Sequence, residues 1–266
     1  MINLALNSYR FLFGRKVFYK LNKFLYLCSL KGMGILNFET NRLSGEAAFI
    51  KKYLLGKKEL IIFDVGANVG EYSKYIYSIN PEVVIHAFEP HPQTFKKLLS
   101  NISSSQFHPN NFAVGNHAGQ LSLYDYKDND GSSHASLYKD VIEKIHKAQT
   151  TEHIVNVITL DFYLKKNKIE KIDLLKIDTE GNELNVIKGL EGYLSKRMVK
   201  VIHFEFNEMN VTSNTYFRDF WDILSEYDLF RMLPNELVKI ATYSPVFCEI
   251  FAYQNLVAIL KDEKLS

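Results

Sequence analysis

A glycine turn and a lone carboxylate at the end of the following strand are the most informative features of this chain. Gly66 and Gly70 follow an apolar run, and glycines let a backbone turn tightly and approach a ligand closely. Asn68, between them, tolerates unusual backbone angles. Glu89 ends a second apolar run, where a carboxylate can accept hydrogen bonds from both hydroxyls of a ribose. The pattern predicts a nucleotide-binding unit of strand, helix and strand.

The glycine spacing favours one kind of nucleotide. A dinucleotide fold uses G-x-G-x-x-G, whereas three residues separate Gly66 from Gly70, so a nicotinamide-dependent oxidoreductase is disfavoured. Asp64 stands just before the first glycine, and its negative charge would repel a pyrophosphate but could hold an ammonium. S-adenosylmethionine carries an ammonium and a ribose diol without a phosphate. It is therefore the ligand that this turn favours.

Composition limits the class of protein. The 266 residues are 47% hydrophobic and 23% charged, which is typical of a globular protein with one large domain or a domain and an appendage. Cys28 and Cys248 are the two cysteines, too few and too widely separated for a disulfide framework or a cysteine-rich metal site. We therefore expect a reducing, cytoplasmic location.

Charge is distributed unevenly along the chain. Residues 1–60 hold 11 Lys and Arg against 3 Asp and Glu, whereas residues 61–266 hold 21 against 27. The acidic remainder has no basic stripe, so nucleic acid is not an expected partner. Residues 1–30 combine apolar and basic side chains at the spacing of an amphipathic helix, and basic residues interrupt the apolar run that a membrane span needs. Two interpretations stay open, a cap over the catalytic domain and peripheral contact with an anionic membrane at its inner face.

Strands and helices alternate after this basic segment. We expect a helical segment over 1–55 and one α/β domain over 56–266, with a parallel-rich sheet covered by helices on both faces. Strands are predicted at 61–63, 83–89, within 107–114, and at 119–124, 154–160, 172–177, 199–206, 229–233 and 255–260. Helices are predicted at 71–78, 92–101, 161–168, 182–194 and 216–226. The polar segment 125–136 is predicted to be a loop, either a substrate contact or a solvated turn.

Acidic side chains gather where two further strands end. Asp178 and Glu180 follow one buried strand, and His203 and Glu205 lie near the end of the next. Ligands of open α/β sheets bind beyond the carboxyl ends of the strands. Helix capping is the alternative role for Asp178 and Glu180, and a buried, hydrogen-bonded ring is the alternative for His203. Glu205 stands between two phenylalanines, where a carboxylate is rarely buried without a partner.

Several motifs in this order resemble the FkbM-type methyltransferases. They are the segments 64–70, 88–90, 111–115, 159–161 and 175–183, with 32–36 and 44–46 similar to the family's lead-in. The resemblance covers roughly residues 30 to 260. It implies a class I, Rossmann-like fold with a mostly parallel seven-stranded sheet, helices on both faces and an N-terminal helical extension, and it implies S-adenosylmethionine-dependent methylation of hydroxyl groups on sugars, polyketides and related metabolites. Thr179 stands where many relatives have valine.

The resemblance also implies roles for individual residues. The methionine part of the cofactor is expected to be held by Asp64, Gly66, Asn68 and Gly70. Glu89 is expected to bind the ribose. Asn111 and Ala113 are expected to line the adenine site, and Asp178 and Glu180 to face the transferred methyl group.

Methylation of a hydroxyl requires a group that accepts its proton. Asp178 is the first candidate and Glu205 or His203 the second, while His134 could enter from the loop. The carboxylates of Asp178, Glu180 and Glu205 could bind magnesium, but nothing in their spacing requires it, so we expect transfer without a metal.

The acceptor is expected to be a small molecule, glycan or glycolipid, because the 19 Phe and 16 Tyr can form a core and a pocket whose aromatic faces stack on sugar rings. The alternative function is a non-catalytic protein that binds an adenosyl ligand or a membrane through the same fold.

Overall fold

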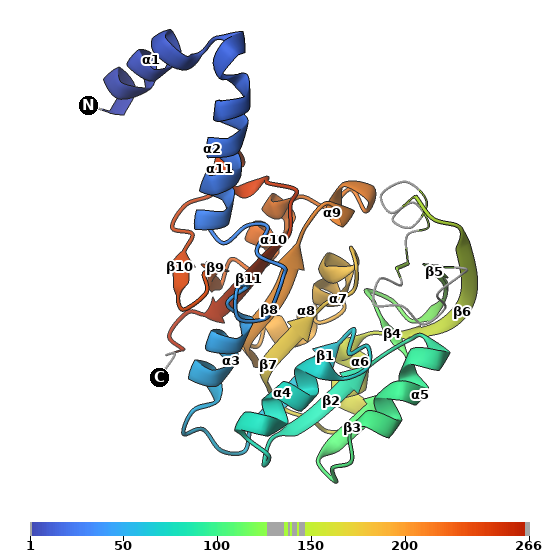
Figure 1. Ribbon diagram of the computed structural model, residues 1–266. Helices are drawn as coiled ribbons and strands as arrows, with labels where there is room; N and C mark the ends of the chain where they lie inside the picture. The colour runs from blue at the N-terminus through green and yellow to red at the C-terminus, as the bar shows by residue number, and fades with distance from the viewer. Residues whose placement is uncertain (1, 127–135, 138, 140–142, 144–146, 264–266) are drawn as a thin grey trace.

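The central element of the protein is a mixed, twisted sheet. The computed structural model describes residues 2–126, 136, 137, 139, 143 and 147–263. Eight strands form the main sheet in the order β10-β9-β11-β8-β7-β1-β2-β3 (Figure 1). Its strands are β1 (Ile61–Val65), β2 (Val84–Phe88), β3 (Phe107–Asn110), β7 (Ile172–Ile177), β8 (Val199–Phe206), β9 (Tyr227–Met232), β10 (Leu237–Lys239) and β11 (Gln254–Leu260).

The sheet divides into a parallel and an antiparallel part. Strands β3, β2, β1, β7 and β8 pair in parallel, while β11, β9 and β10 continue the sheet by antiparallel pairing. The expected seven strands are present, and β10 is an eighth that the sequence analysis missed. Its three residues follow Pro234 and its side chains are half-buried or exposed, so it lacks the apolar run from which the other strands were predicted.

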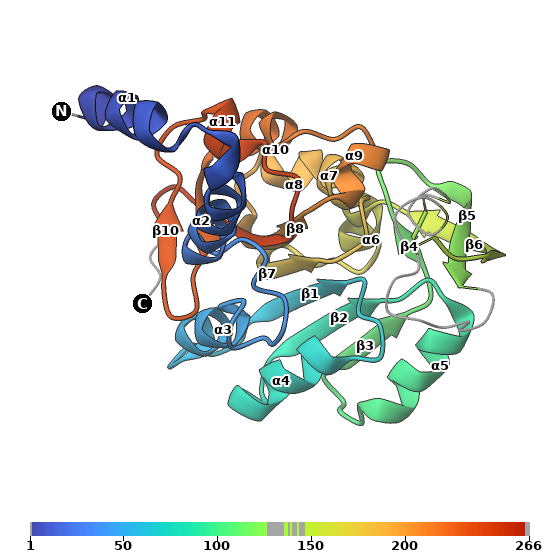
Figure 2. The ribbon, with the colours of Figure 1, turned by 45° about the horizontal axis from the view of Figure 1, so that its top comes forward.

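Helices cover both faces of the sheet, as expected (Figure 2). One layer consists of α3 (Glu46–Leu54), α4 (Glu71–Ile79) and α5 (Pro92–Asn101), and the other of α6 (Leu160–Lys166), α7 (Glu183–Lys188), α8 (Glu191–Leu194) and α10 (Phe217–Ile223). Alternate residues of β1 point to opposite layers, since Ile62 packs with the first and Phe63 with the second. Both strand faces are therefore buried.

The helix predicted at 182–194 is two helices. The backbone leaves α7 at Gly189 and enters α8 at Glu191. A Cβ on Gly189 would overlap the backbone oxygen of Gly115, so the chain passes too close to its neighbour for any other residue. Two shorter helices lie in connections between other elements. Helix α9 (Met209–Thr212) lies between β8 and α10, and α11 (Pro245–Cys248) lies between β10 and β11.

A second, smaller sheet lies beside the carboxyl end of β2 and β3. Strand β4 (Ala113–Val114) pairs in parallel with β6 (Thr150–Ile158), which pairs antiparallel with β5 (Gly119–Tyr126). The partner of β5 is thus the next strand along the chain. Most of the predicted loop 125–136, including His134, lies outside the described residues.

The N-terminal segment projects away from the sheet. Helix α1 (Ile2–Phe13) has no buried residue, and α2 (Tyr19–Gly32) buries only Leu30. A short 3-10 turn, Lys16–Phe18, joins them. Figure 1 shows the two helices projecting from the body. Of the two open interpretations, a cap packed on the domain would bury the apolar side chains of these helices, and most of them are exposed. The expected single helix is broken because the chain turns at Gly14 and the extended Arg15.

The rest of the predicted helical segment belongs to the body. Helix α3 contributes Phe49, Ile50, Tyr53 and Leu54 to the core that it shares with β1 and β2. The division of the chain at residues 55 and 56 stays a prediction.

Candidate functional site

The candidate site lies at the carboxyl ends of β1, β2 and β7. In the sheet, β1 and β7 are neighbours, with β2 beyond β1 and β8 beyond β7. The chain continues from β1 to β2 and from β7 to β8, so the connections that follow β1 and β7 leave in opposite directions. Such a switch point opens a crevice in which α/β folds bind their ligands. The glycine turn, Glu89 and Asp178 all follow strands that end there.

The glycine turn has the backbone that its sequence predicted. Gly66, Asn68 and Gly70 all have positive φ angles, of 82°, 49° and 90°. The N–H groups of Gly66 and Ala67 both donate to the backbone oxygen of Phe88, at 2.9 and 3.0 Å. The turn is therefore fastened to the end of β2 by its own backbone.

Glu89 extends that connection with its side chain. Its Oε2 accepts the Asn68 N–H at 2.9 Å and its Oε1 accepts the His91 N–H at 2.8 Å. Burial raises the pKa of Glu89 to about 7, although the two backbone N–H groups act in the opposite direction. Each carboxylate oxygen has more than one acceptor position, so both can still accept a ligand hydroxyl.

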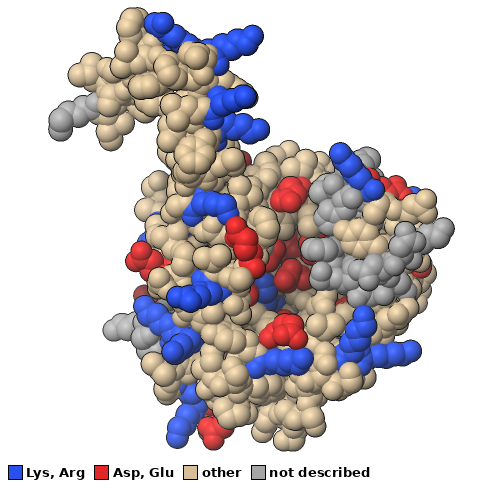
Figure 3. All heavy atoms as spheres, in the orientation of Figure 1, with Lys and Arg blue, Asp and Glu red and all other residues tan. Residues whose placement is uncertain are grey.

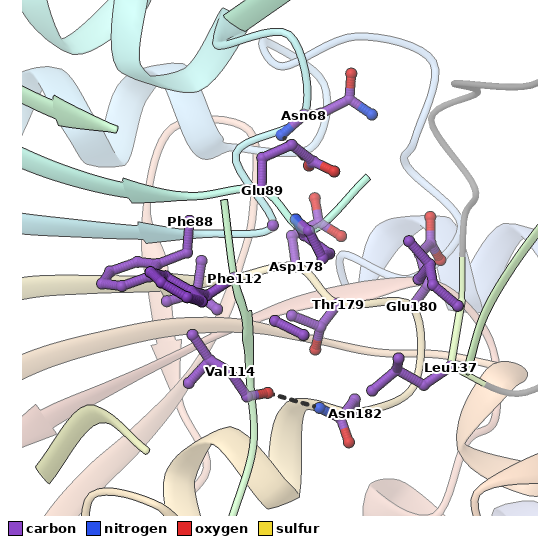
Figure 4. Close-up of a pocket in the computed structure, with 15 residues that line it drawn as sticks. Asn68, Phe88, Glu89, Phe112, Val114, Leu137, Asp178, Thr179, Glu180 and Asn182 are labelled. Atoms are coloured by element: carbon purple, nitrogen blue, oxygen red, sulfur yellow. Dashed lines mark hydrogen bonds between the residues drawn. The ribbon is translucent and has the colours of Figure 1, made fainter. Parts of the chain in front are cut away.

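A first cavity, of about 150 Å³, opens between the end of β2 and the segment after β7. Figure 4 shows Phe88, Phe112 and Val114 on one side of it, and Asn68, Glu89, Asp178 and Glu180 on the other. Asn182 Nδ2 donates to the Val114 oxygen at 2.9 Å and so holds the segment after β7 against β4. One apolar wall and one acidic wall suit an aromatic base that carries a ribose.

Two residues that were expected to bind the cofactor, Asn111 and Gly70, are not among the residues that line this cavity. Asn111 donates through Nδ2 to the backbone oxygens of Glu89 and Pro90, at 2.8 and 3.0 Å. Gly70 caps α4, and a Cβ there would press on Leu98 and Ile102. By contrast, Ala113 lines the cavity.

A second cavity, of about 670 Å³, lies on the other side of the glycine turn. It shares Gly66, Asn68 and Asp178 with the first cavity, and Asp64 and Tyr72 are among its other lining residues. Asp64 is buried and accepts the Ser73 hydroxyl at 2.6 Å. Burial raises the pKa of Asp64 to about 6, against the effect of that hydrogen bond. Asp64 is thus placed where a cationic ligand group would offset the cost of its ionisation.

A buried ammonium connects the acidic residues at the strand ends. Lys176 Nζ, on β7, lies 3.5 Å from Asp178, 3.8 Å from Glu46 and 3.8 Å from Glu205. Burial disfavours its charge, but these carboxylates together raise the pKa of Lys176 well above its usual value. Figure 3 shows acidic side chains gathered at a hollow in this face of the body.

Glu205 and Asp178 differ in their surroundings. Burial and the neighbouring Asp178 raise the pKa of Glu205 well above its usual value, while Lys176 lowers it. The side chain of Asp178 is 37% exposed, compared with 14% for Glu205. Asp178 is therefore the more accessible of the two carboxylates.

His203 is enclosed rather than presented to a cavity. Its Nε2 lies 3.1 Å from Asn255 Oδ1 and its Nδ1 lies 3.3 Å from the Tyr72 hydroxyl. Burial, and secondly Lys176, lower the pKa of His203 well below its usual value, which favours the neutral ring. This is the buried, hydrogen-bonded histidine of the alternative interpretation.

The turn after β7 is organised by a carboxylate that the sequence analysis did not single out. Glu183 Oε1 accepts the N–H groups of Thr179 and Gly181, at 3.0 and 3.1 Å, and the Thr179 hydroxyl at 3.0 Å. Thr179 therefore uses its hydroxyl within the turn. Glu180 has a φ of 54°, and its side chain lines the first cavity.

The other residues that sequence reasoning missed are Lys176, Glu46 and the apolar wall of the first cavity. A lysine in the middle of a buried strand was a visible signal, because a buried charge requires partners. No comparable signal marked Phe112 or Leu137, which reach the cavity from other elements. Within the described part of the chain, no group of three or more His, Cys, Asp or Glu side chains is arranged to hold a metal ion.

The strand order and the site together define a fold of the class I methyltransferase type. The sequence matches the family described as "Methyltransferase FkbM domain" over residues 64–230. This match covers more than half of the chain, and the protein belongs to the FkbM methyltransferase family. The cofactor of this family is S-adenosylmethionine.

Three relatives illustrate the extent of the similarity. "Methyltransferase sdnD" of Sordaria araneosa is 30% identical over 49% of this chain and 60% of its own length. The "31-O-demethyl-FK506 methyltransferase FkbM" of Streptomyces tacrolimicus is 28% identical over 56% of this chain and 70% of its own length. The "2-O-methyltransferase NoeI" of Sinorhizobium fredii is 23% identical over 68% of this chain and 77% of its own length.

A solved structure of the plantazolicin methyltransferase BpumL, in complex with SAH, aligns over 89% of this chain and 98% of its own. The TM-score is 0.43 and the identity is 10%.

The residues at the site fit this cofactor. Glu89 has acceptor positions for a diol, Phe88 and Phe112 form an apolar wall for an aromatic base, and Asp64 is a buried carboxylate beside the turn. The three features surround Gly66 and Asn68, which line both cavities. One elongated ligand could therefore pass across the glycine turn from one cavity to the other.

Proposed function

We propose that this protein transfers the methyl group of S-adenosylmethionine to a hydroxyl group of a sugar, a glycolipid or polysaccharide, or a secondary metabolite. The observation that carries the proposal is the position of Asp178, which is among the lining residues of both cavities. The names of two relatives, which specify methylation at an oxygen position, support a hydroxyl acceptor.

The cofactor, when bound, supplies a methyl group activated by its positively charged sulfur, so that the sulfur–carbon bond breaks as the new oxygen–carbon bond forms. The acceptor hydroxyl must lose its proton at the same time. We assign Asp178 as the group that takes this proton, because its carboxylate is the most exposed of those around Lys176. Glu205 is the second candidate. Its side chain is 14% exposed, compared with 37% for Asp178, so an acceptor hydroxyl would reach it less easily.

His203 is a less suitable proton acceptor than either carboxylate. Both of its ring nitrogens face protein partners, Tyr72 and Asn255. Removal of a proton from an acceptor would require one of these contacts to break. We therefore propose that His203 supports the site from behind, by fixing Tyr72 at the wall of the second cavity.

A polyhydroxylated acceptor suits the lining of the second cavity. Asn41, Glu46 and Asp178 bring amide and carboxylate groups, and Tyr72 and Tyr75 bring aromatic rings to its wall. Hydroxyl groups of a sugar can donate to such carboxylates, and the faces of its ring can pack on tyrosine. This chemistry favours a sugar-containing acceptor over a wholly apolar one.

The test is a search for methylated product with a panel of acceptors. The purified protein would be incubated with S-adenosylmethionine and with glycosides, polysaccharide fragments, glycolipids and a hydroxylated polyketide, and S-adenosylhomocysteine and the methylated product would be measured by mass spectrometry. Asp178→Asn should lower turnover by roughly 10²- to 10⁴-fold with little change in cofactor affinity, whereas Asp262→Asn, at an exposed position, should behave as wild type. Loss of cofactor binding in Asp178→Asn equal to that in Glu89→Ala would show that Asp178 is misassigned.

We propose that transfer needs no metal. The carboxylates near Asp178 already have Lys176 as a counter-ion, which is a role that a bound cation would otherwise take. Addition of a chelator should leave turnover unchanged. Complete loss of activity that magnesium restores would contradict this proposal.

We also propose a cytoplasmic location with peripheral contact between residues 1–30 and an anionic membrane. Both cysteines are free thiols, which fits a reducing compartment. No helix in the described residues has the length and apolar character of a membrane span. Contact at the surface is supported by the many exposed apolar side chains of α1 and α2. Failure of the intact protein to sediment with anionic liposomes at low salt would remove this part of the proposal.

A further inference from the structure

The N-terminal helices form an exposed arm with a definite shape. We call residues 2–30 the arm. The Tyr9 hydroxyl donates to Asn22 Oδ1 at 2.6 Å, and Asn22 Nδ2 donates to the Phe13 oxygen at 3.0 Å. The Phe13 ring packs edge-on against Phe18 and stacked on Tyr9. These contacts fix α1 against α2 at an elbow, so the arm presents a surface of set geometry.

That surface is apolar and basic at once. Many large hydrophobic side chains of the arm are exposed, and they are Ile2, Leu4, Leu6, Tyr9, Phe11, Leu12, Val17, Tyr19, Leu21, Phe24, Leu25, Tyr26 and Leu27. Arg10, Arg15, Lys16, Lys20 and Lys23 are exposed among them, and no acidic residue precedes Glu39 in the chain. Figure 3 shows the basic side chains along one side of the arm. A surface of this composition suits anionic lipid better than a second copy of the same basic arm.

A second exposed apolar feature lies beside the base of the arm. Val246 and Phe247, on the short helix α11, are 76% and 61% exposed. Figures 1 and 2 both place α11 next to α2. A cavity of about 350 Å³ is lined by Gly32 and Met33, from the end of α2, together with Phe247 and Cys248.

The tip of α11 is rigidly supported from within the body. Cys248 is buried, and the Arg231 guanidinium donates to the Phe247 oxygen at 3.0 Å. Glu249, directly after the helix, accepts the N–H groups of Phe217 and Arg218, at 2.8 and 3.0 Å, and the Tyr243 hydroxyl. These hydrogen bonds stabilise the negative charge of Glu249. Val246 and Phe247 are thus two apolar side chains that point outward from a fixed support.

We propose that Val246 and Phe247 are a second membrane anchor, which binds the same anionic lipid surface as the arm. This inference rests on the proposed contact between residues 1–30 and a membrane. It adds that α11 binds the same lipid surface. Two anchors joined through the body would determine how the protein is oriented, whereas the arm alone would act as a tether. An acceptor carried by a lipid would then meet the candidate site in one orientation.

The test is binding of the full chain to vesicles of phosphatidylcholine with and without phosphatidylglycerol, at low and high salt. Wild type should bind the anionic vesicles, and more weakly as salt rises. Replacement of Val246 and Phe247 by aspartate should weaken binding by roughly 100-fold or more, since the partition of two apolar side chains is lost. The matched control replaces Leu99 and Leu121 by aspartate. These residues are exposed on α5 and β5, and binding should remain as in wild type.

A fluorescent reporter measures insertion directly. Phe247→Trp, in a Trp221→Phe background, should show emission at shorter wavelength when anionic vesicles are added. Cofactor binding measured by calorimetry should be the same in all variants, so failure of the methyltransferase proposal would be seen separately.

Three other results would each contradict a different part of the proposal. Loss of binding in Phe11→Asp with Leu12→Asp, but wild-type binding when Val246 and Phe247 are replaced, would overturn the second anchor and leave the arm as the membrane contact. No binding by wild type at low salt would overturn both. A dimer in light scattering that depends on Phe247, without vesicle binding, would assign this surface to a second copy of the chain.

Discussion

The carboxylate of Glu89 accepts a hydrogen bond from the backbone N–H of Asn68 at 2.9 Å, and this contact joins the end of β2 to the glycine turn after β1. Asn68 has a positive φ, and the turn presents its N–H to Glu89, while Asn68 is among the residues that line both cavities. Glu89, which is proposed to bind the ribose, therefore also supports the glycine turn. That turn is proposed to hold the methionine part of the cofactor.

Glu89→Gln should weaken binding of S-adenosylmethionine by roughly 10- to 100-fold, because a hydrogen bond to a charged group contributes about 1.5–3 kcal/mol. The amide keeps the size of the side chain, but its NH₂ group cannot accept the backbone N–H of Asn68 or His91. Calorimetric titration would measure the dissociation constant. Glu82→Gln, at an exposed position, is the control and should bind as wild type does. Equal affinity in Glu89→Gln and wild type would remove Glu89 from the cofactor site.

Cofactor affinity should depend on pH through the same carboxyl group. Burial raises the pKa of Glu89 to about 7, so in the free protein the group is protonated at lower pH. A ribose diol donates to the ionised form, and binding should therefore release a proton below pH 7. We expect affinity to fall as pH decreases, by as much as about tenfold per unit.

Calorimetry in two buffers with different enthalpies of ionisation measures that proton directly. At pH 6 the wild type should release close to one proton per cofactor bound, and Glu89→Gln should release fewer. Proton release that is the same in the two proteins would identify another group, of which Asp64, with a pKa of about 6, is the nearest candidate.

The local part of the site was predictable from sequence because it depends on neighbouring residues. Gly66, Asn68 and Gly70 have positive φ angles, as expected from residue types that tolerate this conformation. The strand at 199–206 and the helix at 92–101 have the expected bounds, since each is a clear apolar pattern ended by breaking residues.

The remainder depends on contacts between distant segments. Glu46, Lys176 and Glu205 come from α3, β7 and β8, and only the folded sheet places them around one ammonium. The arm also shows that a local pattern is predictable while its contacts are not. Its periodicity predicted a helix, but periodicity identifies an apolar face without identifying what covers it.

Gly66→Ala should destabilise the protein more than Gly56→Ala does. Both glycines have positive φ, 82° and 71°, which costs another residue roughly 1–2 kcal/mol. A Cβ on Gly66 would also overlap the backbone carbonyl of Asp178, whereas a Cβ on Gly56 meets nothing within 4 Å. The extra strain should add about 1–3 kcal/mol.

Urea unfolding of the two variants would measure this difference, and Gly56→Ala isolates the cost of the backbone angle alone. Equal loss of unfolding free energy in the two variants would mean that the segment after β7 can move away. In that case Gly66→Ala should still alter cofactor binding, because Asp178 would be displaced from both cavities.

Lys176→Met should destabilise the protein by about 3–5 kcal/mol at neutral pH, because it removes a buried cation and leaves three partly buried carboxylates without their counter-ion. The effect should increase with pH. Burial raises the pKa of Glu46 and of Glu205, and Lys176 opposes both shifts. Without the lysine, the folded-state pKa values rise further above those of the unfolded chain. The protonated carboxyls are then tolerated at low pH, and stability is lost as pH rises through the folded-state pKa values.

Thermal unfolding between pH 5 and pH 8 would test this sign. The melting temperature of Lys176→Met should approach that of wild type at pH 5 and fall below it at pH 8, while Lys188→Met, on the exposed face of α7, should follow wild type throughout. Combining Lys176→Met with Glu46→Gln removes one of the carboxylates and should recover part of the loss at pH 8. A deficit that is constant with pH would mean that Lys176 stabilises the fold through packing of its methylene chain instead of its charge.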